Sequence, residues 1–254
     1  MKVDAVILAG GDGEVIDPTC KFKGLVPVAG KPLVEWVVDA FCAATTINEI
    51  AVVMPTAEGL GSWVDRVDKL VVSDGMFMDN ALAGAASFRA DRPVLIATGD
   101  IPLVTPDAID DLVRASLETE ADFIYPMVRR DEMERQFPGS ERTYFRLKSG
   151  SHTGGNAMLA NPRLIPAARD LGQRLFDQRK NTIGMLRIAG VGFVVRFVMG
   201  RLEPQDLAGK IQQLLGGTGA AVVTPHASLA VDVDKPSDLA LVERVLRERA
   251  CASE

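Results

Sequence analysis

The stretch Val3-Asp4-Ala5-Val6-Ile7-Leu8-Ala9-Gly10-Gly11-Asp12-Gly13 decides which fold the sequence predicts. Its first part, Val3 to Leu8, is a short β-branched run, typical of a strand buried between two layers of helices. Three glycines in the next few residues let the backbone approach a ligand closely and aim its N–H groups at an anion such as phosphate. The loop is not a Walker A loop, because no Gly-Lys-Ser/Thr follows, and Ile16 takes the last glycine position of a dinucleotide fingerprint. Taken alone, the loop is equally well explained as a tight turn without a ligand.

Three more apolar runs predict buried strands: Ile50 to Met54, Val94 to Ala97 and Phe123 to Val128. Helical patterns lie between them. Thr105-Pro106-Asp107 combines an N-cap, a proline at the first helical position and an acid in the first turn, and Pro236 opens another helix. The alternation predicts a mostly parallel sheet with helices on both faces. In such sheets ligands bind beyond the carboxyl ends of the strands.

Composition narrows the function classes. The chain has 254 residues and a net charge of -6, so no overall basic field attracts nucleic acid or an anionic membrane. Cys20, Cys42 and Cys251 are odd in number and too far apart for a C-x-x-C site, which favours a reducing compartment. The apolar run near Met1 is too short for a signal peptide. We therefore expect a cytoplasmic protein that does not bind nucleic acid.

The glycine loop is followed by KGLVPVAGKPL at residues 23–33. Together the two segments resemble the MobA-like NTP transferase family and its sugar-nucleotide relatives, whose signature runs from L-A-G-G-x-G to P-K-x-L-x-P-V-x-G-K-P-L. The resemblance covers residues 3–40, 93–103 and 228–240. It implies a Rossmann-like three-layer α/β/α nucleotidyltransferase fold with a mostly parallel mixed sheet, formed by residues 1–254 as a single domain. The alternative for Lys23 and Lys31 is that both are solvated surface lysines.

The resemblance also implies roles for the residues of the loop. Backbone N–H groups around Gly11, Asp12 and Gly13 would hold the β- and γ-phosphates of an NTP, and Lys23 would neutralise charge that develops on the α-phosphate. Lys23 and Asp100 are the implied catalytic residues. The implied nucleotide-binding residues are Leu8, Ala9, Gly10, Gly11, Asp12, Gly13, Lys23, Asn80 and Asp100.

Two positions depart from the family pattern. The family usually carries an arginine two positions after the last glycine of the loop, where this chain has Val15, and Phe22 replaces the proline before the signature lysine. Lys21 is the nearest residue that offers a positive charge in place of that arginine. The effect of Val15 on turnover is left open.

The sequence Thr98-Gly99-Asp100 ends a predicted strand, so the Asp100 carboxylate is expected at the edge of the sheet, where it would hold Mg²⁺ against the triphosphate. The resemblance includes a similar G-D-x-P-L. The segment Val231-Asp232-Val233-Asp234 resembles the closing motif of these enzymes. Read as a strand, it points Asp232 and Asp234 to the same side, so either would complete the magnesium site, with Asp234 the first choice. The alternatives are a turn residue for Asp100 and a helix cap for Asp234.

Relatives place the segment that reads the nucleobase between Ser73 and Ala86. Asn80 offers a donor and an acceptor to a base edge. The equal alternative is that Asp79 and Asn80 cap the following helix. The identity of the base is left open.

Residues 129–215 are expected to form an insert within the domain that binds the acceptor or mediates oligomerisation. Arginine side chains and a flexible glycine pair suit an anionic acceptor, and the candidates are Arg142, Arg146, Gly155 and Asn156. For the arginines of 129–135, pairing with neighbouring acids on a solvated face is favoured instead. Residues 183–202 predict a buried or dimer-forming apolar helix or helix pair, and its three arginines argue against a membrane span.

These features favour a Mg²⁺-dependent nucleotidyltransferase that moves NMP from an NTP to a small phosphorylated acceptor and releases pyrophosphate. The resemblance suggests a molybdenum-cofactor precursor, a sugar phosphate or a polyol or alcohol phosphate as the acceptor. The alternatives are a glycosyltransferase of related fold that uses a nucleotide sugar and a nucleotide-binding protein without turnover. A homo-oligomer is compatible with all three, and His152 is given no role.

Overall fold

A computed structural model gives the structure of residues 1–178, 188 and 190–252. Within these residues nine strands form one sheet and two further strands form a hairpin. The strands of the sheet are β1 (Val3–Leu8), β4 (Ile47–Met54), β5 (Lys69–Val72), β6 (Val94–Thr98), β7 (Phe123–Arg129), β8 (Phe145–Leu147), β9 (Gly150–Gly154), β10 (Ala157–Ala160) and β11 (Gly219–Thr224). The hairpin consists of β2 (Pro27–Val28) and β3 (Lys31–Pro32).

The helices of the described residues connect these strands and cover the sheet. The α-helices are α1 (Leu33–Ala43), α2 (Phe77–Ala86), α3 (Pro106–Glu118), α4 (Arg130–Gln136), α5 (Leu164–Gln178), α7 (Val191–Val198), α8 (Pro204–Leu215) and α9 (Pro236–Ala252). The 3-10 helices are η1 (Lys23–Leu25), η2 (Ser62–Arg66) and η3 (Ala227–Ala230).

The sheet is mixed. Its strand order is β5-β4-β1-β6-β10-β7-β9-β8, and β11 also pairs with β7. The pairs β5–β4, β4–β1, β1–β6 and β7–β11 are parallel, whereas β10 and β9 run antiparallel to their neighbours. The four strands expected from apolar runs are all present, and the expected α/β fold with a mostly parallel mixed sheet is confirmed.

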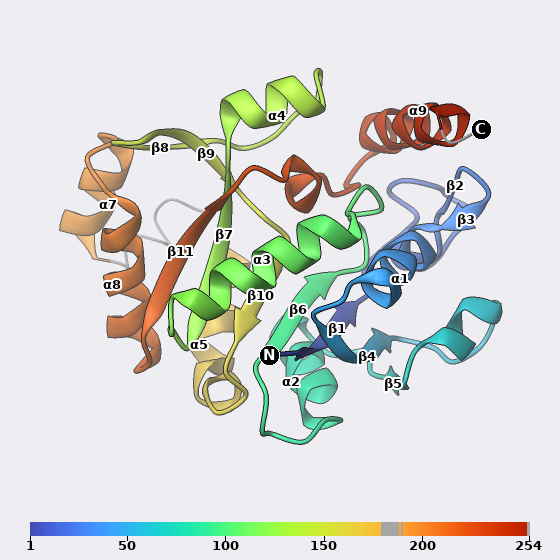
Figure 1. Cartoon of the computed structure of the whole chain (residues 1–254), viewed down its shortest axis with the longest axis horizontal. Coiled ribbons are helices and arrows are strands. Elements are labelled where there is room, and N and C mark those ends of the chain that lie inside the picture. The colour runs from blue at the N-terminus through green and yellow to red at the C-terminus, as the bar shows by residue number, and fades with distance from the viewer. Residues whose placement is uncertain (179–187, 189, 253–254) are drawn as a thin grey trace.

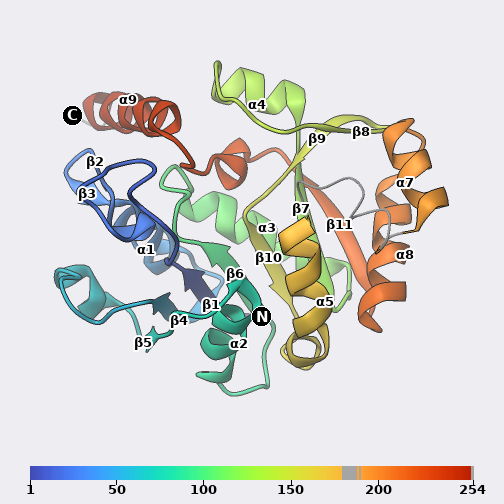
Figure 2. The ribbon, with the colours of Figure 1, turned by 180° about the vertical axis from the view of Figure 1, so that it is seen from behind.

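Alternating side chains of β1 face two separate cores. Val3, Ala5 and Ile7 pack in a cluster with residues of α1 and α3, while Val6 packs in another with residues of α2 and α5. Figure 1 shows α1 and α3 in front of the sheet, and Figure 2, seen from behind, shows α2 and α5 in front. The sheet is therefore the middle of three layers.

A third core holds residues 231–233 against the segment that follows the glycine loop. Val26 and Val28 of the β2 region pack with Val231 and Val233 and with Val242 of α9. Figure 1 shows α9 beside the β2–β3 hairpin, at the side of the molecule away from α7 and α8. Residues 231–234 are thereby held next to segments that precede them by about 200 positions.

Helix starts follow the sequence signals. Thr105 caps α3, because its hydroxyl accepts the Ala108 N–H at 3.2 Å, and Pro106 is the first residue of that helix. Pro236 opens α9 as expected. No strand forms at residues 231–234, so that prediction is wrong, and within the described residues the segment has no ladder partner.

The expected apolar helix at 183–202 is only partly described. Residues 183–187 and 189 lie outside the described part of the chain, and α7 begins at Val191. Val191, Val195 and Val198 are exposed on α7, so the prediction of a buried helix is wrong for this face. Within residues 1–178, 188 and 190–252, no helix combines the length and hydrophobicity needed to cross a membrane. Pairing of α7 with a second copy of the chain stays a prediction.

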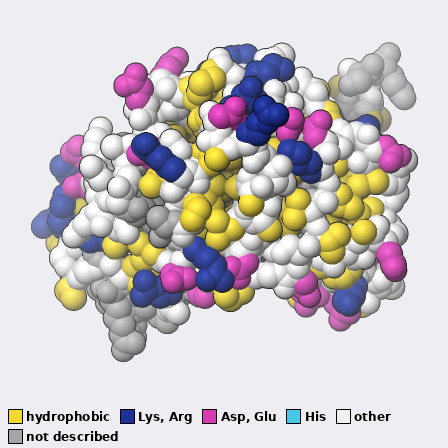
Figure 3. Space-filling view, turned by 90° about the horizontal axis from the view of Figure 1, so that it is seen from below, with side chains coloured by type: hydrophobic (Ala, Val, Ile, Leu, Met, Phe, Trp, Pro, Cys, Tyr) yellow, Lys and Arg dark blue, Asp and Glu magenta, His cyan; other side chains and the backbone are white. Residues whose placement is uncertain are grey.

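Charged side chains of both signs are mixed on the surface. Figure 3 shows Lys and Arg interspersed with Asp and Glu over the face seen from below. The arginines of residues 129–135 pair with nearby acids, since Arg129 contacts Asp131 and Arg135 contacts Glu132. Such pairs leave little unbalanced positive charge for a polyanion on this segment.

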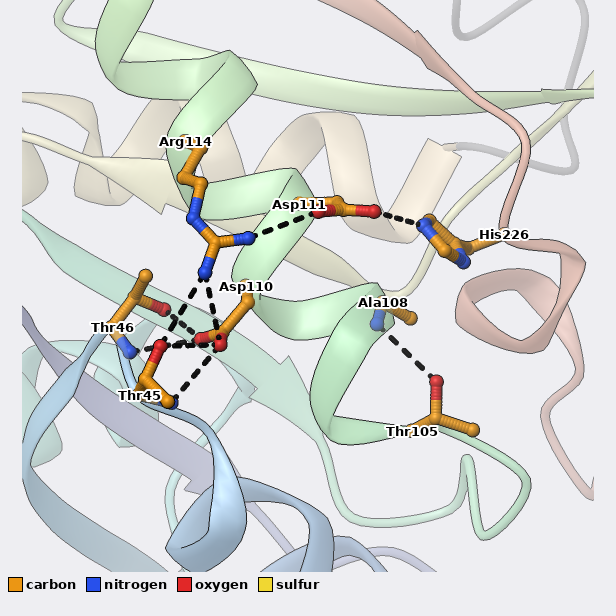
Figure 4. A network of polar contacts seen from close by, with 8 residues as sticks. All are labelled: Thr45, Thr46, Thr105, Ala108, Asp110, Asp111, Arg114 and His226. Carbon is orange, nitrogen blue, oxygen red and sulfur yellow. Dashed lines mark hydrogen bonds and ion pairs between the residues drawn. The ribbon is translucent and has the colours of Figure 1, made fainter.

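One buried carboxylate joins α3 to the turn before β4. Asp110 is 5% exposed, and its two oxygens accept hydrogen bonds from the backbone N–H and the hydroxyl of both Thr45 and Thr46. Figure 4 shows these contacts, with Arg114 also reaching Asp110. Burial alone would raise the pKa of Asp110, but the threonine hydrogen bonds outweigh it and lower the pKa from 3.8 to about 2.

We predict that Asp110→Asn destabilises the fold by about 2 kcal/mol at neutral pH. The NH2 group of the asparagine side chain would face threonine donors and could not accept their hydrogen bonds. The folded-state pKa lies below the unfolded value. The stabilisation from Asp110 is therefore complete above about pH 4 and is lost as the pH falls toward 2. Urea denaturation of both proteins at pH 7, 4 and 3 measures the difference.

The matched control is Asp111→Asn on the same helix. The Asp111 carboxylate is half-exposed and pairs with Arg114 and His226, so its loss should cost less than about 1 kcal/mol. The role given to Asp110 would be contradicted if the two substitutions lowered the free energy of unfolding equally. It would also be contradicted if the effect of Asp110→Asn on that free energy did not change with pH.

Candidate active site

Three backbone segments meet at Ala9, directly after β1. A side chain on Gly24 would place its Cβ 2.6 Å from the Ala9 carbonyl oxygen, and one on Gly99 would place it 2.8 Å from the Ala9 Cβ. The Gly99 N–H also donates to the Leu8 carbonyl at 2.8 Å. Both glycines are buried, and only the lack of a side chain allows this approach. Their neighbours Lys23 and Asp100 are therefore brought to the same edge of the sheet.

The glycine loop is braced by the segment that follows it. Asp12 and Phe22 form an isolated antiparallel bridge, in which the Gly13 N–H donates to the Lys21 carbonyl at 3.1 Å and the Lys23 N–H donates to the Gly11 carbonyl at 3.0 Å. The Gly13 N–H is thus already used within the loop. The expectation that it binds phosphate is not supported by this geometry.

The two departures from the family pattern lie in different surroundings, since Val15 is exposed whereas Phe22 packs against the core that contains α1 and α3. The Val15 side chain is 63% exposed. The Lys21 ammonium lies over the Phe22 ring, 5.1 Å from its centre, which is a cation–π distance. Lys21 is therefore placed against the loop rather than among the carboxylates described next.

Lys23 bridges two carboxylates from distant parts of the chain. Its Nζ donates to Asp100 Oδ2 and, at 2.6 Å, to Asp234 Oδ1. The Lys23 and Asp100 side chains are nearly buried, whereas Asp234 is more than half exposed. Burial by itself lowers the pKa of Lys23, but the two ion pairs outweigh it and the pKa is raised. Lys23 is therefore charged at neutral pH.

A second cation lies beside the third carboxylate. Arg142, in the segment before β8, donates through Nη2 to Asp232 Oδ1 and through Nη1 to the Asp232 carbonyl. Both side chains are about 15% exposed. Burial lowers the pKa of Arg142, and the nearby carboxylates of Asp238, Asp234 and Asp100 act against it. The guanidinium keeps its charge in any case.

Asp232 and Asp234 reach Asp100 without the expected strand. Val231 and Val233 are buried in the third core, so the intervening aspartates point out of it, and the Val233 N–H donates to the Asp100 carbonyl at 3.0 Å. Near the start of α9, Asp238 accepts the Asp234 N–H at 3.0 Å.

The three carboxylates form the candidate metal site. Oxygens of Asp100, Asp232 and Asp234 all lie within 4.8 Å of one another. Carboxylate oxygens are the ligands that Mg²⁺ prefers. Asp100 Oδ1 is buried and has no hydrogen-bond partner in the described part of the chain, and the same is true of Thr98 Oγ1. A buried oxygen without a partner is costly, so the donor set fits a cation.

The acceptor candidates separate into two groups. Arg142 lies in the cluster, and the buried Asn156 Nδ2 has no partner among the described residues, although the Asn156 backbone is fixed to Thr98 and Leu229. Arg146 is exposed on β8 with its stem against Gly200, where both ribbon views show the β8–β9 hairpin reaching toward α7. The structure does not bring Arg146 to the cluster.

The glycine pair at 154–155 has a packing explanation. A Cβ on Gly154 would overlap the Tyr125 hydroxyl, and the Gly155 N–H donates to the Pro126 carbonyl at 2.9 Å. Both glycines therefore serve the contact with β7. His152 is also buried at this strand, with Nδ1 3.1 Å from the Gly150 carbonyl, and burial lowers its pKa.

The Asn80 amide faces its own loop. Its Oδ1 accepts from Ser73 Oγ and from the Gly75 N–H, and its Nδ2 donates to the Gly75 carbonyl at 3.0 Å. Asp79 pairs with Arg169 of α5. Neither side chain caps α2, since the N-cap is Met76 and its side chain makes no capping bond. The capping alternative is wrong, and Asn80 instead closes the loop at 73–75.

Sequence reasoning missed the link between Arg142 and Asp232 and the close contacts of Gly24 and Gly99 with Ala9. For the glycines a signal exists, because each directly adjoins a charged candidate, Lys23 or Asp100. For the ion pair the sequence offers no signal, since its partners are 90 positions apart.

Several known proteins are similar to this chain. Residues 5–187 match the family model described as the MobA-like NTP transferase domain. A solved structure of a hypothetical transferase from Thermus thermophilus is 33% identical, superposes with a TM-score of 0.81, and covers 94% of this chain and 100% of that chain.

Two curated proteins of named function are also similar to this chain. The bifunctional protein GlmU of Allorhizobium ampelinum is 27% identical over 96% of this chain and 53% of that protein. The 2-C-methyl-D-erythritol 4-phosphate cytidylyltransferase of Bifidobacterium longum is 34% identical over 48% of this chain and 41% of that protein. The chain thus spans about half or less of the length of the curated relatives it matches.

We predict that Gly24→Ala destabilises the protein by about 2 kcal/mol, because its Cβ would meet the Ala9 carbonyl and force the two segments apart. Gly10→Ala is the matched control, since its Cβ would lie 3.6 Å from Pro55, an ordinary contact. It should change stability by less than about 0.5 kcal/mol. Urea denaturation measures both, and similar costs at the two positions would show that the contact at Ala9 is not the constraint.

Proposed function

The chain belongs to the MobA-like NTP transferase family, and from this premise we propose that it is a cytoplasmic, Mg²⁺-dependent nucleotidyltransferase. It would transfer NMP from an NTP to a small phosphorylated acceptor and release pyrophosphate. The observation that carries the proposal is the meeting of Lys23 with Asp100 and Asp234 at the end of β1 and β6. A lysine beside a glycine loop and a carboxylate cluster are the two parts that such a transfer needs.

In the proposed reaction an acceptor oxygen attacks the α-phosphorus in line, the bond to the bridging oxygen of the β-phosphate breaks, and pyrophosphate leaves with that oxygen. Lys23 donates hydrogen bonds to the α-phosphate and stabilises the charge that develops there. Its raised pKa keeps it protonated through neutral pH. Mg²⁺ bound to the aspartates would supply positive charge against the triphosphate. No covalent enzyme intermediate is needed.

Backbone donors would hold the terminal phosphates. The Gly13 N–H is used by Lys21, so this role is assigned to the backbone of Gly10, Gly11 and Asp12. Leu8 and Ala9 form the base of the same turn. The positive φ of Gly11, +97°, is a conformation that residues with a side chain rarely adopt, which supports a loop shaped for close approach.

For the nucleobase, the proposed reader is the loop at 73–75. Asn80 holds this loop through three hydrogen bonds and acts as a positioning residue, because its amide is already used. Backbone groups of the loop are then presented to the base edge.

For the acceptor, the proposed contacts are Arg142 and Asn156, since both lie next to Asp100 or Thr98 and carry a buried nitrogen without a partner in the described residues. A guanidinium and an amide suit a phosphate group. The name of the Bifidobacterium longum relative specifies a phosphorylated compound, which supports an acceptor of this class. Sugar phosphates, polyol phosphates and molybdenum-cofactor precursors form the first screening panel.

Thermal melting with ATP, CTP, GTP and UTP, each with and without Mg²⁺, tests the proposal. We expect one NTP to raise Tm by several degrees in a Mg²⁺-dependent manner, because a ligand that binds only the folded state stabilises it. Asp100→Ala should abolish the shift, whereas Asp17→Ala, which removes a carboxylate outside the cluster, should retain it. That NTP then enters a pyrophosphate-release assay with the acceptor panel.

Two outcomes count against the proposal. If no NTP shifts Tm while a nucleotide sugar does, the glycosyltransferase alternative replaces it. If an NTP binds but no acceptor in a broad panel yields pyrophosphate, the protein binds nucleotides without turnover.

Asn80→Ala should weaken binding of the preferred NTP by about tenfold, since the 73–75 loop loses three hydrogen bonds that hold it. Asp79→Asn, which loses only charge in an exposed pair with Arg169, should change the affinity less than twofold or so. Calorimetric titration gives both constants. Unchanged affinity in Asn80→Ala would remove the loop from the base site.

A further inference from the structure

The acidic cluster already contains two cations of the protein. Asp100, Asp232 and Asp234 supply three negative charges, and Lys23 and Arg142 supply two positive ones. These five side chains leave one net negative charge, and the nearby Asp238 carboxylate adds a second. The two cations therefore cancel much of the field that an incoming divalent ion would meet.

Lys23 and a metal ion would compete for the same oxygens. The Lys23 ammonium bonds one oxygen each of Asp100 and Asp234, and these carboxylates lie within 4.8 Å of each other. An ion bound by both would stand where the ammonium stands, because Mg²⁺–oxygen distances are about 2.1 Å. Lys23 has a flexible four-carbon stem, so it can move to another acceptor when one is offered.

Arg142 is held differently. It contacts both the carboxylate and the backbone carbonyl of Asp232, and the two side chains are nearly buried. The Lys23–Asp100 pair is equally buried, but a divalent ion that replaces Lys23 would keep both of its carboxylates compensated. Arg142 also donates to a backbone carbonyl, so removing it would cost that bond as well. Asp232 is therefore the counter-ion that positions Arg142.

We propose that Lys23 occupies the cation position between Asp100 and Asp234 until a triphosphate draws it away, so that a divalent ion binds well only together with a triphosphate. Asp100 and Asp234 are then the metal ligands, and Asp232 is a positioning residue for Arg142. The part of the proposal that concerns the triphosphate rests on the proposed function. The part that concerns Lys23 and the metal is tested without any nucleotide.

The test is a titration with Mn²⁺ alone, with free Mn²⁺ followed by electron paramagnetic resonance in 0.15 M salt or so, where distant charges are screened. Lys23→Met should bind Mn²⁺ about tenfold tighter than the wild type, because a positive charge a few ångströms from the ion is removed. Lys21→Met is the matched control. Its ammonium lies over Phe22, so the substitution should leave the Mn²⁺ affinity within about twofold.

Double variants identify the ligands. In the Lys23→Met background, Asp234→Asn should remove the gain in Mn²⁺ affinity and Asp232→Asn should retain most of it. No gain in Lys23→Met, or an equal gain in Lys21→Met, would overturn the role of Lys23. Loss of the gain in the Asp232 variant but not in the Asp234 variant would overturn the choice of ligands.

A second measurement uses the wild type and inorganic tripolyphosphate, which carries no base. Mg²⁺ and tripolyphosphate together should raise Tm by more than the sum of their separate shifts, and simply additive shifts would overturn the proposed coupling. This measurement tests the coupling between metal and triphosphate binding even if the Lys23→Met variant does not fold. Pyrophosphate release by the wild type is measured separately. An enzyme that releases pyrophosphate but does not replace Lys23 with a metal ion can then be distinguished from a protein that replaces Lys23 but releases no pyrophosphate.

Discussion

Close backbone contact at Ala9 is the constraint on which the rest of the site depends. Gly24 and Gly99 approach this residue from two segments, and neither could do so with a side chain. The contact brings the backbones of Lys23 and Asp100 together, and the ion pair between their side chains adds to it. Ala9 directly follows β1, whose side chains pack into the cores on both faces of the sheet, so the site and the fold depend on the same segment.

A charged cluster of this kind costs free energy to assemble, because each group loses water. Lys23 and Arg142 offset much of that cost by pairing with the carboxylates. The stability of the empty protein and its readiness for an anionic ligand therefore depend on the same two side chains. Residues with perturbed pKa values often occur in functional sites, where the same charged groups affect both stability and binding.

Much of the fold could be predicted because local signals and tertiary packing agree. Val3 to Leu8 and Val94 to Thr98 are apolar and become neighbouring parallel strands, so the residues after them meet at one edge. The Thr105 hydroxyl and Pro106 together mark the start of α3. The meeting of Lys23, Asp100 and Asp234 could be expected from the family resemblance and from this shared edge.

Other features depend on contacts that the sequence does not encode locally. Asn80 has the right groups for a base, yet three hydrogen bonds turn it toward Ser73 and Gly75. The Tyr125 hydroxyl lies against Gly154 and leaves no room for a side chain there. Arg146 belongs to β8, which reaches toward α7 and away from the cluster. Asp232 and Asp234 share a side through the burial of Val231 and Val233 rather than through strand pairing.

The ion pair between Lys23 and Asp234 spans 211 positions of the chain, which has a consequence for synthesis. The strands β1, β4 and β6 can pair as soon as residues 1–98 have left the ribosome, whereas the cluster of Lys23, Asp100 and Asp234 is complete only after residue 234 has been added. Loop closure over this length is slow relative to local pairing. A nascent chain therefore carries Lys23 and Asp100 without Asp234 while residues 101–233 are added.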